Sequence, residues 1–201
     1  MNIQLMHDMT FYAMYACAAL AVFVSIERLI FYVVTMKHAR DLEAVMHHDI
    51  HDIGELPENL VNRDSIPVEV LRQMLETKQK LTRRSDLEDL SEAIYIAMKA
   101  KLGARLWMLD TVVTAAPLLG LLGTILGIID TFKVLATSGV SDPSGVSRAI
   151  GTALLATALG IAIALVGLVF FNHFQERVDR INDHIKILLL RAGIGTNYAA
   201  E

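Results

Sequence analysis

Residues 111–129 read TVVTAAPLLGLLGTILGII, an uncharged stretch between Asp110 and Asp130. As a helix it is long enough to cross the hydrocarbon core of a bilayer, which is roughly 30 Å thick and needs about 20 apolar residues. Residues 149–172 also contain no charge, and neither do residues 9–26, after which apolar residues resume from 29 to 34. The sequence therefore predicts an all-α integral membrane protein with three transmembrane helices.

The composition supports this reading mainly through the way charges are distributed. The chain has 201 residues, of which 54% are hydrophobic and 20% are charged. Soluble chains usually carry about 45–50% apolar residues, so the excess is modest, but the charged residues are strongly segregated along the chain. The net charge of -4 gives no sign of nucleic-acid binding. The single cysteine, Cys17, excludes an internal disulfide.

The first apolar stretch is predicted to be a retained helix. It lacks the positively charged segment and the small-residue cleavage site of a secretory signal peptide, and its apolar run is too long. Lys and Arg then set the orientation, because positive residues stay on the cytoplasmic side. Residues 36–106 carry eleven of the 18, the tail after residue 175 carries four, and the segment before the first helix carries none. We expect a bacterial inner-membrane protein with a periplasmic N-terminus and a cytoplasmic C-terminus.

This topology divides the chain into four expected regions. They are an outer N-terminus with transmembrane helix one (1–36), a cytoplasmic helical region (37–106), transmembrane helices two and three (107–175) and a cytoplasmic C-terminal helix (176–201).

Helices two and three are expected to extend far into the cytoplasm. Ser85 and Glu88 fit a capping box, and no proline or glycine follows until Gly103, so helix two is predicted to begin near Asp86 and to run on into the membrane. An apolar stripe through residues 178, 181, 185 and 188 extends helix three towards Gly193, a length of about 50 residues. Stripes of this kind need neighbouring helices, which favours oligomerisation.

Small residues recur at helical spacing in both of these helices. Gly123 and Gly127 form a GxxxG pair, with Gly120 one turn earlier, and Ala156 and Gly160 continue a four-residue spacing in helix three. Small residues on one stripe let helix backbones approach closely, so we interpret all five as helix-packing positions.

Thr124 and Thr157 are predicted to lie at nearly the same depth in the membrane. At 1.5 Å per residue, Thr124 is about 21 Å above Asp110, and Thr157 is about 18 Å above the inner boundary. Two interpretations are open: the hydroxyls line a pore, or each bonds the carbonyl four residues earlier in its own helix.

The charged residues of the apolar regions lie near the interfaces. Asp110 and Asp130 are 20 residues apart, and Glu27 and Arg28 fall near the cytoplasmic end of helix one. No acid, base or histidine lies in mid-membrane in helices two or three. A hydroxyl relays a proton without titrating near neutral pH, so a proton transporter of this sequence needs an ionisable group from elsewhere.

The sequence gives little support to metal binding or catalysis. His47 and His51 could share a helical face, but their stretch is charged and has no second group of ligands, so we expect no metal site. The chain has no P-loop, no GxSxG motif and no dinucleotide fingerprint after a strand. We expect no enzymatic activity and no cofactor.

Two segments carry a family resemblance. Residues 116–128, APLLGLLGTILGI, and residues 153–160, ALLATALG, resemble the helix-two and helix-three signatures of the MotA/TolQ/ExbB proton-channel family, and are most like those of ExbB. The resemblance is strong over residues 107–175 and includes the expected topology. The first half of the chain resembles the family only in pattern.

The resemblance implies a role and partners. Family members form pentamers around a pore that holds a dimer of a single-span ExbD-like or TolR-like partner with a membrane aspartate. Proton flow then drives a periplasm-spanning protein of the TonB or TolA type, here for outer-membrane transport. Thr124 and Thr157 match the family's pore threonines. Thr152 replaces a frequent glutamate and is included among the pore-lining residues. The alternatives are a TolQ-like motor subunit for envelope maintenance and a non-conducting oligomeric scaffold of the same fold.

Overall fold

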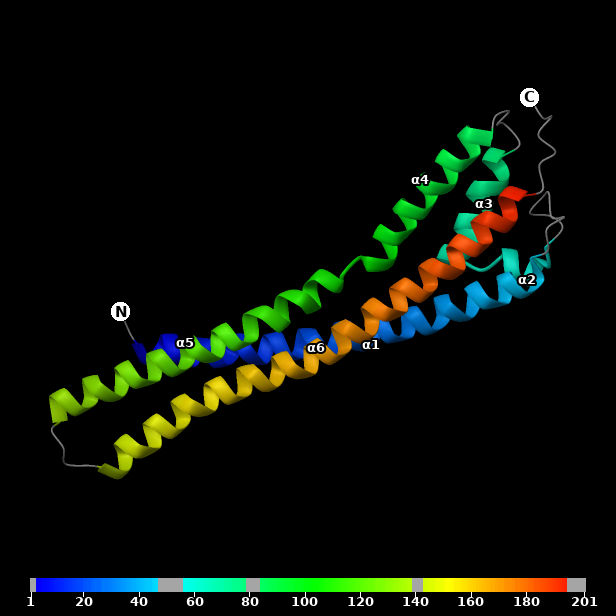
Figure 1. Cartoon of the computed structure of the whole chain (residues 1–201). Coiled ribbons are helices and arrows are strands. Elements are labelled where there is room, and N and C mark those ends of the chain that lie inside the picture. The colour runs from blue at the N-terminus through cyan, green and yellow to red at the C-terminus, as the bar shows by residue number, and fades with distance from the viewer. Residues whose placement is uncertain (1–2, 47–55, 79–83, 139–142, 195–201) are drawn as a thin grey trace. The chain divides into compact units, whose positions relative to one another are not determined.

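The computed structural model describes residues 3–46, 56–78, 84–138 and 143–194, and all of its regular structure in these ranges is helical (Figure 1). The helices are α1 (Ile3–Val45), α2 (Glu58–Val61), α3 (Ile66–Lys78), α4 (Arg84–Gly103), α5 (Leu106–Ser138) and α6 (Pro143–Ile194). They form two compact units. Unit 1 comprises residues up to 27 and 105–173, and unit 2 comprises residues 28–104 and those from 174 onward.

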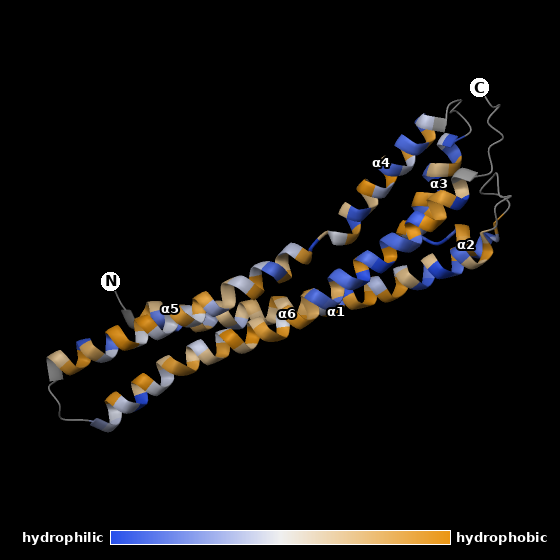
Figure 2. Ribbon diagram, viewed as in Figure 1, coloured by the Kyte–Doolittle hydropathy of each residue, from blue (hydrophilic) through white to orange (hydrophobic). Residues whose placement is uncertain are grey.

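Three helices are long and apolar enough to cross a membrane, over Leu5–Val45, Leu106–Ala136 and Pro143–Ala192. Figure 2 shows apolar ribbon along most of α5 and along the unit 1 part of α6, whereas α3 and α4 alternate between polar and apolar residues. The predicted all-α class with three spanning helices is confirmed, and the chain is a multi-pass membrane protein. The expected region boundaries after residues 36, 106 and 175 stay a prediction, because the two units are defined by packing and not by a bilayer.

The prediction of one continuous helix from Asp86 into the membrane is wrong. The chain forms two helices there, α4 and α5, separated at Ala104 and Arg105. Arg105 has a φ of 70°, a left-handed conformation that interrupts the helical hydrogen-bond ladder. Short turns close both ends, with Ala104 N donating to Lys101 O and Met108 N to Arg105 O. By contrast, α6 has 52 residues, close to the length expected of helix three. The side of the membrane on which its last turns lie stays a prediction.

The apolar stripes outside the spanning stretches are buried within unit 2 itself. Ile181, Ile185 and Leu188 of α6 are fully buried, and Met98 and Leu102 of α4 are 2% and 0% exposed. In α3 the buried set includes Leu71, Met74 and Leu75. The neighbours that these stripes need therefore come from the same chain, so the stripes alone no longer argue for oligomerisation.

Three helices of unit 2 have their last carbonyl groups satisfied by side chains from other helices. Tyr32 donates its hydroxyl to Leu102 O of α4 at 2.9 Å. Lys78, which is 7% exposed, donates to Ala192 O of α6 at 2.5 Å. Such carbonyls have no partner within their own helix, and positive charge is favoured near them. Burial lowers the pKa of the Lys78 ammonium.

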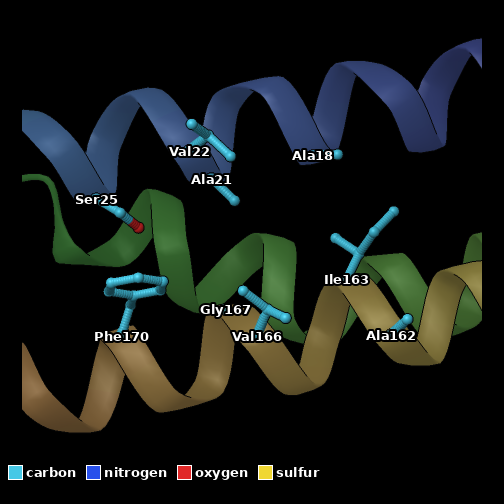
Figure 3. A pocket seen from close by; sticks show the side chains of 9 residues that line it. All are labelled: Ala18, Ala21, Val22, Ser25, Ala162, Ile163, Val166, Gly167 and Phe170. Carbon is cyan, nitrogen blue, oxygen red and sulfur yellow. The ribbon is translucent and has the colours of Figure 1, made fainter.

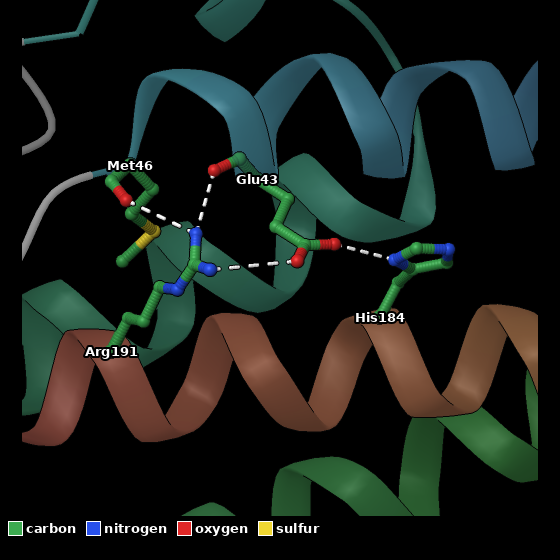
Figure 4. Close-up of polar contacts among 4 residues, drawn as sticks. All are labelled: Glu43, Met46, His184 and Arg191. Carbon is green, nitrogen blue, oxygen red and sulfur yellow. Dashed lines mark hydrogen bonds and ion pairs between the residues drawn. The ribbon is translucent and has the colours of Figure 1, made fainter.

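Arg191 serves the end of α1 in the same way (Figure 4). Its guanidinium donates to Glu43 O at 2.7 Å and to Met46 O at 3.3 Å, and it also lies 3.5 Å from a Glu43 carboxylate oxygen. The other Glu43 oxygen contacts His184 Nδ1 at 2.5 Å. These contacts join the last turns of α1 and α6 inside unit 2.

Candidate functional site: two threonines between α5 and α6

Glycines bring the backbones of α5 and α6 together in unit 1. A methyl group built on Gly120 would lie 2.8 Å from Ala156 O and 3.0 Å from Thr157 Cα. One built on Gly160 would overlap Ala116 O. Atoms at these separations clash, so a larger side chain at either position requires the helices to move apart.

The first turns of α1 complete the packing. A methyl group on Gly123 would lie 2.9 Å from Ala156 Cβ and 3.2 Å from Thr10 Oγ1. One turn further along α5, a methyl group on Gly127 would lie 2.8 Å from Ala153 Cβ and 3.1 Å from His7 Nε2. Gly123 and Gly127 therefore lie where α1, α5 and α6 meet.

The two threonine hydroxyls meet at this junction. Thr124 Oγ1 contacts Thr157 Oγ1, and it lies 3.1 Å from Gly120 O and 3.0 Å from Ala153 O. Thr157 Oγ1 lies 3.1 Å from Gly120 O, so each hydroxyl reaches a carbonyl of the other helix. Both side chains are half-buried.

This cluster holds two hydroxyl protons and four oxygen atoms. Thr124 reaches both its own-helix carbonyl, Gly120 O, and the opposite helix, so the two interpretations left open by the sequence are not exclusive. A hydroxyl both donates and accepts, so a pair in contact can pass a proton, whereas neither can store one at neutral pH.

Thr152 does not join the cluster. Its side chain is exposed and donates to Arg148 O of its own helix at 3.0 Å. Asp110 is exposed in the first turns of α5, and Asp130 is half-buried about two turns before its end. These three residues lie apart from the threonine pair in the part of unit 1 that the structure describes.

Glu27 and Arg28 are adjacent in sequence but have different surroundings. Glu27 pairs with the Arg105 guanidinium at 3.1 Å, which joins α1 to the break before α5 within unit 1. In unit 2, Arg28 is 5% exposed and its guanidinium lies 4.8 Å from the centre of the Phe31 ring, a cation–π contact. Glu27 thus pairs beside a helix break and Arg28 packs against an aromatic ring, while the position of both as interfacial charges stays a prediction.

An apolar cavity of about 260 Å³ lies between α1 and α6 in unit 1 (Figure 3). It is lined by Ala18, Ala21, Val22 and Ser25 of α1 and by residues of α6 between Ala162 and Phe170. Ser25 supplies its only side-chain polar group, and no lining side chain titrates near neutral pH. The cavity therefore offers no site for storing a proton.

Sequence reasoning gave His7 no role, yet the structure places it against Gly127. His7 is an isolated histidine near the start of α1 and belongs to no periodic pattern or motif, so nothing in the sequence marks it as a functional residue. Within the described ranges, no group of three or more His, Cys, Asp or Glu side chains could hold a metal ion. The His47 and His51 pair lies outside those ranges.

Comparison with known proteins finds a matching family. The model of the MotA/TolQ/ExbB proton channel family matches residues 62–187, more than half of the chain, and this stretch includes both threonines. The chain belongs to the MotA/TolQ/ExbB proton channel family. The match reaches well beyond the two signature segments, into α3, α4 and along α6 as far as residue 187, so membership extends over both units.

Relatives within the family carry two different names. The chain is 35% identical over 81 residues to the biopolymer transport protein ExbB of Aquifex aeolicus, covering 40% of this chain and 55% of that protein. For ExbB of Helicobacter pylori the identity is 34% over 92 residues, covering 46% and 63%. For the Tol-Pal system protein TolQ of Pseudomonas aeruginosa it is 34% over 98 residues, covering 47% and 42%. The chain thus spans about a third to two thirds of the length of the curated relatives it matches.

Proposed function

We propose that this chain is an inner-membrane proton-channel subunit that works with a single-span, ExbD-like partner to harvest the proton motive force. Its role is that of a stator or motor subunit, which energises a TonB-like protein for outer-membrane transport. The observation that carries the proposal is the contact between the Thr124 and Thr157 hydroxyls at the junction of three apolar helices, in a member of a proton channel family.

The role of the partner follows from the lack of an ionisable side chain in α5 and α6 near the threonine pair. The described stretch of α5 from Thr111 to Ile129 has no ionisable side chain, and α6 has none from Ala149 to Asn172. A proton crossing this level therefore uses a carboxylate brought by another subunit, such as the membrane aspartate of an ExbD-like or TolR-like protein. Half-buried hydroxyls solvate such a carboxylate or bridge it to water, which a methyl group cannot do.

The assembly is proposed to be a homopentamer in membrane lipid around the partner, with a periplasmic N-terminus and a cytoplasmic C-terminus. The similarity to TolQ favours a second candidate, a TolQ-like motor subunit for envelope maintenance that acts on a TolA-like protein. The tight glycine packing of α5 on α6 favours a third candidate, a non-conducting oligomeric scaffold of the same fold.

Substitution of the two threonines tests the proposal. Thr→Val keeps the shape and removes the hydroxyl, whereas Thr→Ser keeps the hydroxyl and removes a methyl group. We expect Val at position 124 or 157 to abolish energy coupling in a proton-gradient-dependent transport or growth assay, and Ser to be largely tolerated. If the two threonines serve only in packing, the Val variants should be more active than the Ser variants, because Ser leaves a small void.

Thr131 supplies the matched control. It is 7% exposed on α5 and donates to Gly127 O of its own helix at 2.8 Å. Thr131→Val removes a buried hydroxyl of the same kind away from the threonine pair, and should leave coupling intact. Co-purification and the mass of the complex in detergent report assembly. Active Val variants at both 124 and 157 would contradict the proposal, and so would Val variants that fail only because the complex falls apart.

A further inference from the structure

His7 has a buried nitrogen for which the structure provides no partner. Among the residues that the structure describes, its Nε2 atom finds no hydrogen-bond partner although it is buried, and the side chain as a whole is 16% exposed. Buried polar atoms in proteins are nearly always paired, and leaving one unpaired is unfavourable. An imidazole nitrogen in this situation marks a place where a water molecule or a group from another subunit completes the site.

The imidazole is adjacent to the threonine cluster. The methyl position on Gly127 lies 3.1 Å from His7 Nε2 and 2.8 Å from Ala153 Cβ. Ala153 is the residue whose carbonyl lies 3.0 Å from Thr124 Oγ1. His7 therefore lies against Gly127, which in turn lies against Ala153, the residue whose carbonyl contacts the Thr124 hydroxyl.

The backbone of α1 is fixed at the same place. Thr10 donates its hydroxyl to His7 O at 2.7 Å, and Thr10 itself lies against Gly123, the residue before Thr124. The imidazole also packs edge-on against Phe11, with ring centroids 5.1 Å apart. The position of His7 is thus set by packing within α1 and against α5.

We propose that His7 is the chain's own proton-exchanging residue beside the threonine pair, a group that helices α5 and α6 lack. Neutral imidazole accepts a proton at one ring nitrogen, becomes imidazolium, and returns to the neutral form when it passes a proton to an oxygen acceptor. Here the acceptor is water held between Nε2 and the threonine hydroxyls, or the partner's carboxylate. Histidine is the side chain whose ordinary pKa lies in the physiological range, which suits repeated exchange. The inference rests on the proposed function and deepens it.

The charges that surround His7 are compatible with this role. On its own helix, Asp8 Oδ1 lies 3.9 Å from His7 Nδ1, and the Asp8 side chain is 60% exposed. Gly127, which α5 places against the ring, and Ala153 of α6, which lies against Gly127, are uncharged. The nearest charged residues along those two helices are Asp130 and Lys133 on α5 and Arg148 on α6. Asp8 is thus the carboxylate that the described structure brings within ion-pair distance of the imidazole.

The test is the pH dependence of proton-driven activity in the assembled complex. His7→Gln keeps a side chain that donates and accepts hydrogen bonds but does not titrate, and His38→Gln, a half-buried histidine of α1 in unit 2, is the matched control. We expect proton flux at neutral pH to fall by about a hundredfold in His7→Gln, the smaller end of what a positioned proton-transfer group contributes. We also expect the pH dependence of the flux to change in His7→Gln and to be unchanged in His38→Gln.

A merely structural His7 gives a different result, because assembly and flux then fall together at every pH and the profile keeps its shape. If His7→Gln does not assemble, ¹⁵N-histidine NMR of the native complex decides. A His7 signal, assigned by its loss in His7→Asn, that titrates between about pH 5 and 8 supports the proposal, and one that does not titrate overturns it.

Failure of this inference is separable from failure of the proposed function. Native flux and pH profile in His7→Gln, together with inactive Thr124→Val, would overturn the role of His7 and leave the channel function standing. Active Thr124→Val and Thr157→Val would overturn the channel function itself.

Discussion

At the scale of single residues, several polar side chains in this protein bond backbone carbonyls of other helices. The Thr157 hydroxyl reaches Gly120 O, the Tyr32 hydroxyl reaches Leu102 O, and the Lys78 ammonium reaches Ala192 O. A helix terminus or a close helix crossing exposes such oxygens, and burial without a donor is unfavourable. A substitution that removes any of these donors therefore acts on two groups, the side chain and the carbonyl it served.

Lys78 gives a prediction with a defined pH dependence. Its pKa is lowered by burial in the folded chain, so the unfolded chain binds this proton more tightly and the native state gains stability as pH rises towards the ordinary value of about 10.4. Compared with Lys78→Met, the native chain should gain free energy of unfolding between about pH 8 and 10. Thermal unfolding of the full chain in detergent measures this. The exposed Lys99→Met variant should show no such trend, and a pH-independent difference for Lys78→Met would refute the argument.

At the scale of the helical elements, the break between α4 and α5 rests on one residue. Arg105 adopts a positive φ, which for a side chain other than glycine is unfavourable by about 1–2 kcal/mol. Its guanidinium pairs with Glu27, and its carbonyl accepts from Met108 N in the first turn of α5. Local backbone strain is thus offset by contacts that the sequence does not reveal.

Replacement of Arg105 discriminates a broken from a continuous helix. Arg105→Gly and Arg105→Ala both lose the ion pair, but only Gly relieves the left-handed conformation. We expect Arg105→Gly to be the more stable of the two by about 1 kcal/mol, measured by denaturant or thermal unfolding in detergent. In a continuous helix the order would reverse, because Ala is favoured over Gly there by about 1 kcal/mol.

Glycines within α6 differ in what surrounds them. A methyl group at Gly160 would overlap Ala116 O, whereas Gly151 has nothing within 4 Å of that position. We expect Gly151→Ala to be neutral or to stabilise by up to about 1 kcal/mol through helix propensity. Gly160→Ala should destabilise by about 1–3 kcal/mol, because the two backbones must separate. Equal effects on thermal unfolding would show that α5 and α6 do not approach as closely as described.

At the scale of the whole molecule, α1 and α6 each contribute to both units, so membrane helices and the helical region beyond them are parts of the same long elements. The distribution of Lys and Arg predicts which side of the membrane unit 2 occupies. Eleven of the 18 fall between residues 36 and 106, which predicts that this region is cytoplasmic.

Labelling of engineered cysteines tests this orientation. With Cys17, the single cysteine, replaced by Ala, a membrane-impermeant thiol reagent added outside should label Ser141→Cys and should not label Ser85→Cys until the membrane is permeabilised. The opposite pattern of labelling would show that the topology is inverted.

The sequence by itself determined the class, the number of spanning helices and the family. Uncharged runs such as residues 111–129 are long enough to fix a membrane helix without any tertiary contact, because unpaired backbone groups are not tolerated in lipid. Helical periodicity also placed Thr124 and Thr157 at one level, since depth along a helix grows by a constant rise per residue. The structure brings these two hydroxyls into contact.

The tertiary structure decided which residues far apart in the sequence come into contact. The break at Arg105 depends on a pairing with Glu27, 78 residues away, and the partner of an apolar stripe such as that of Ile181 and Ile185 proved to lie within the same chain. His7 gained its position only because Gly127 and Ala153 leave room for an imidazole beside them. Each of these is a long-range contact, and a pattern of residue types along one helix carries no information about which distant residue its face will meet.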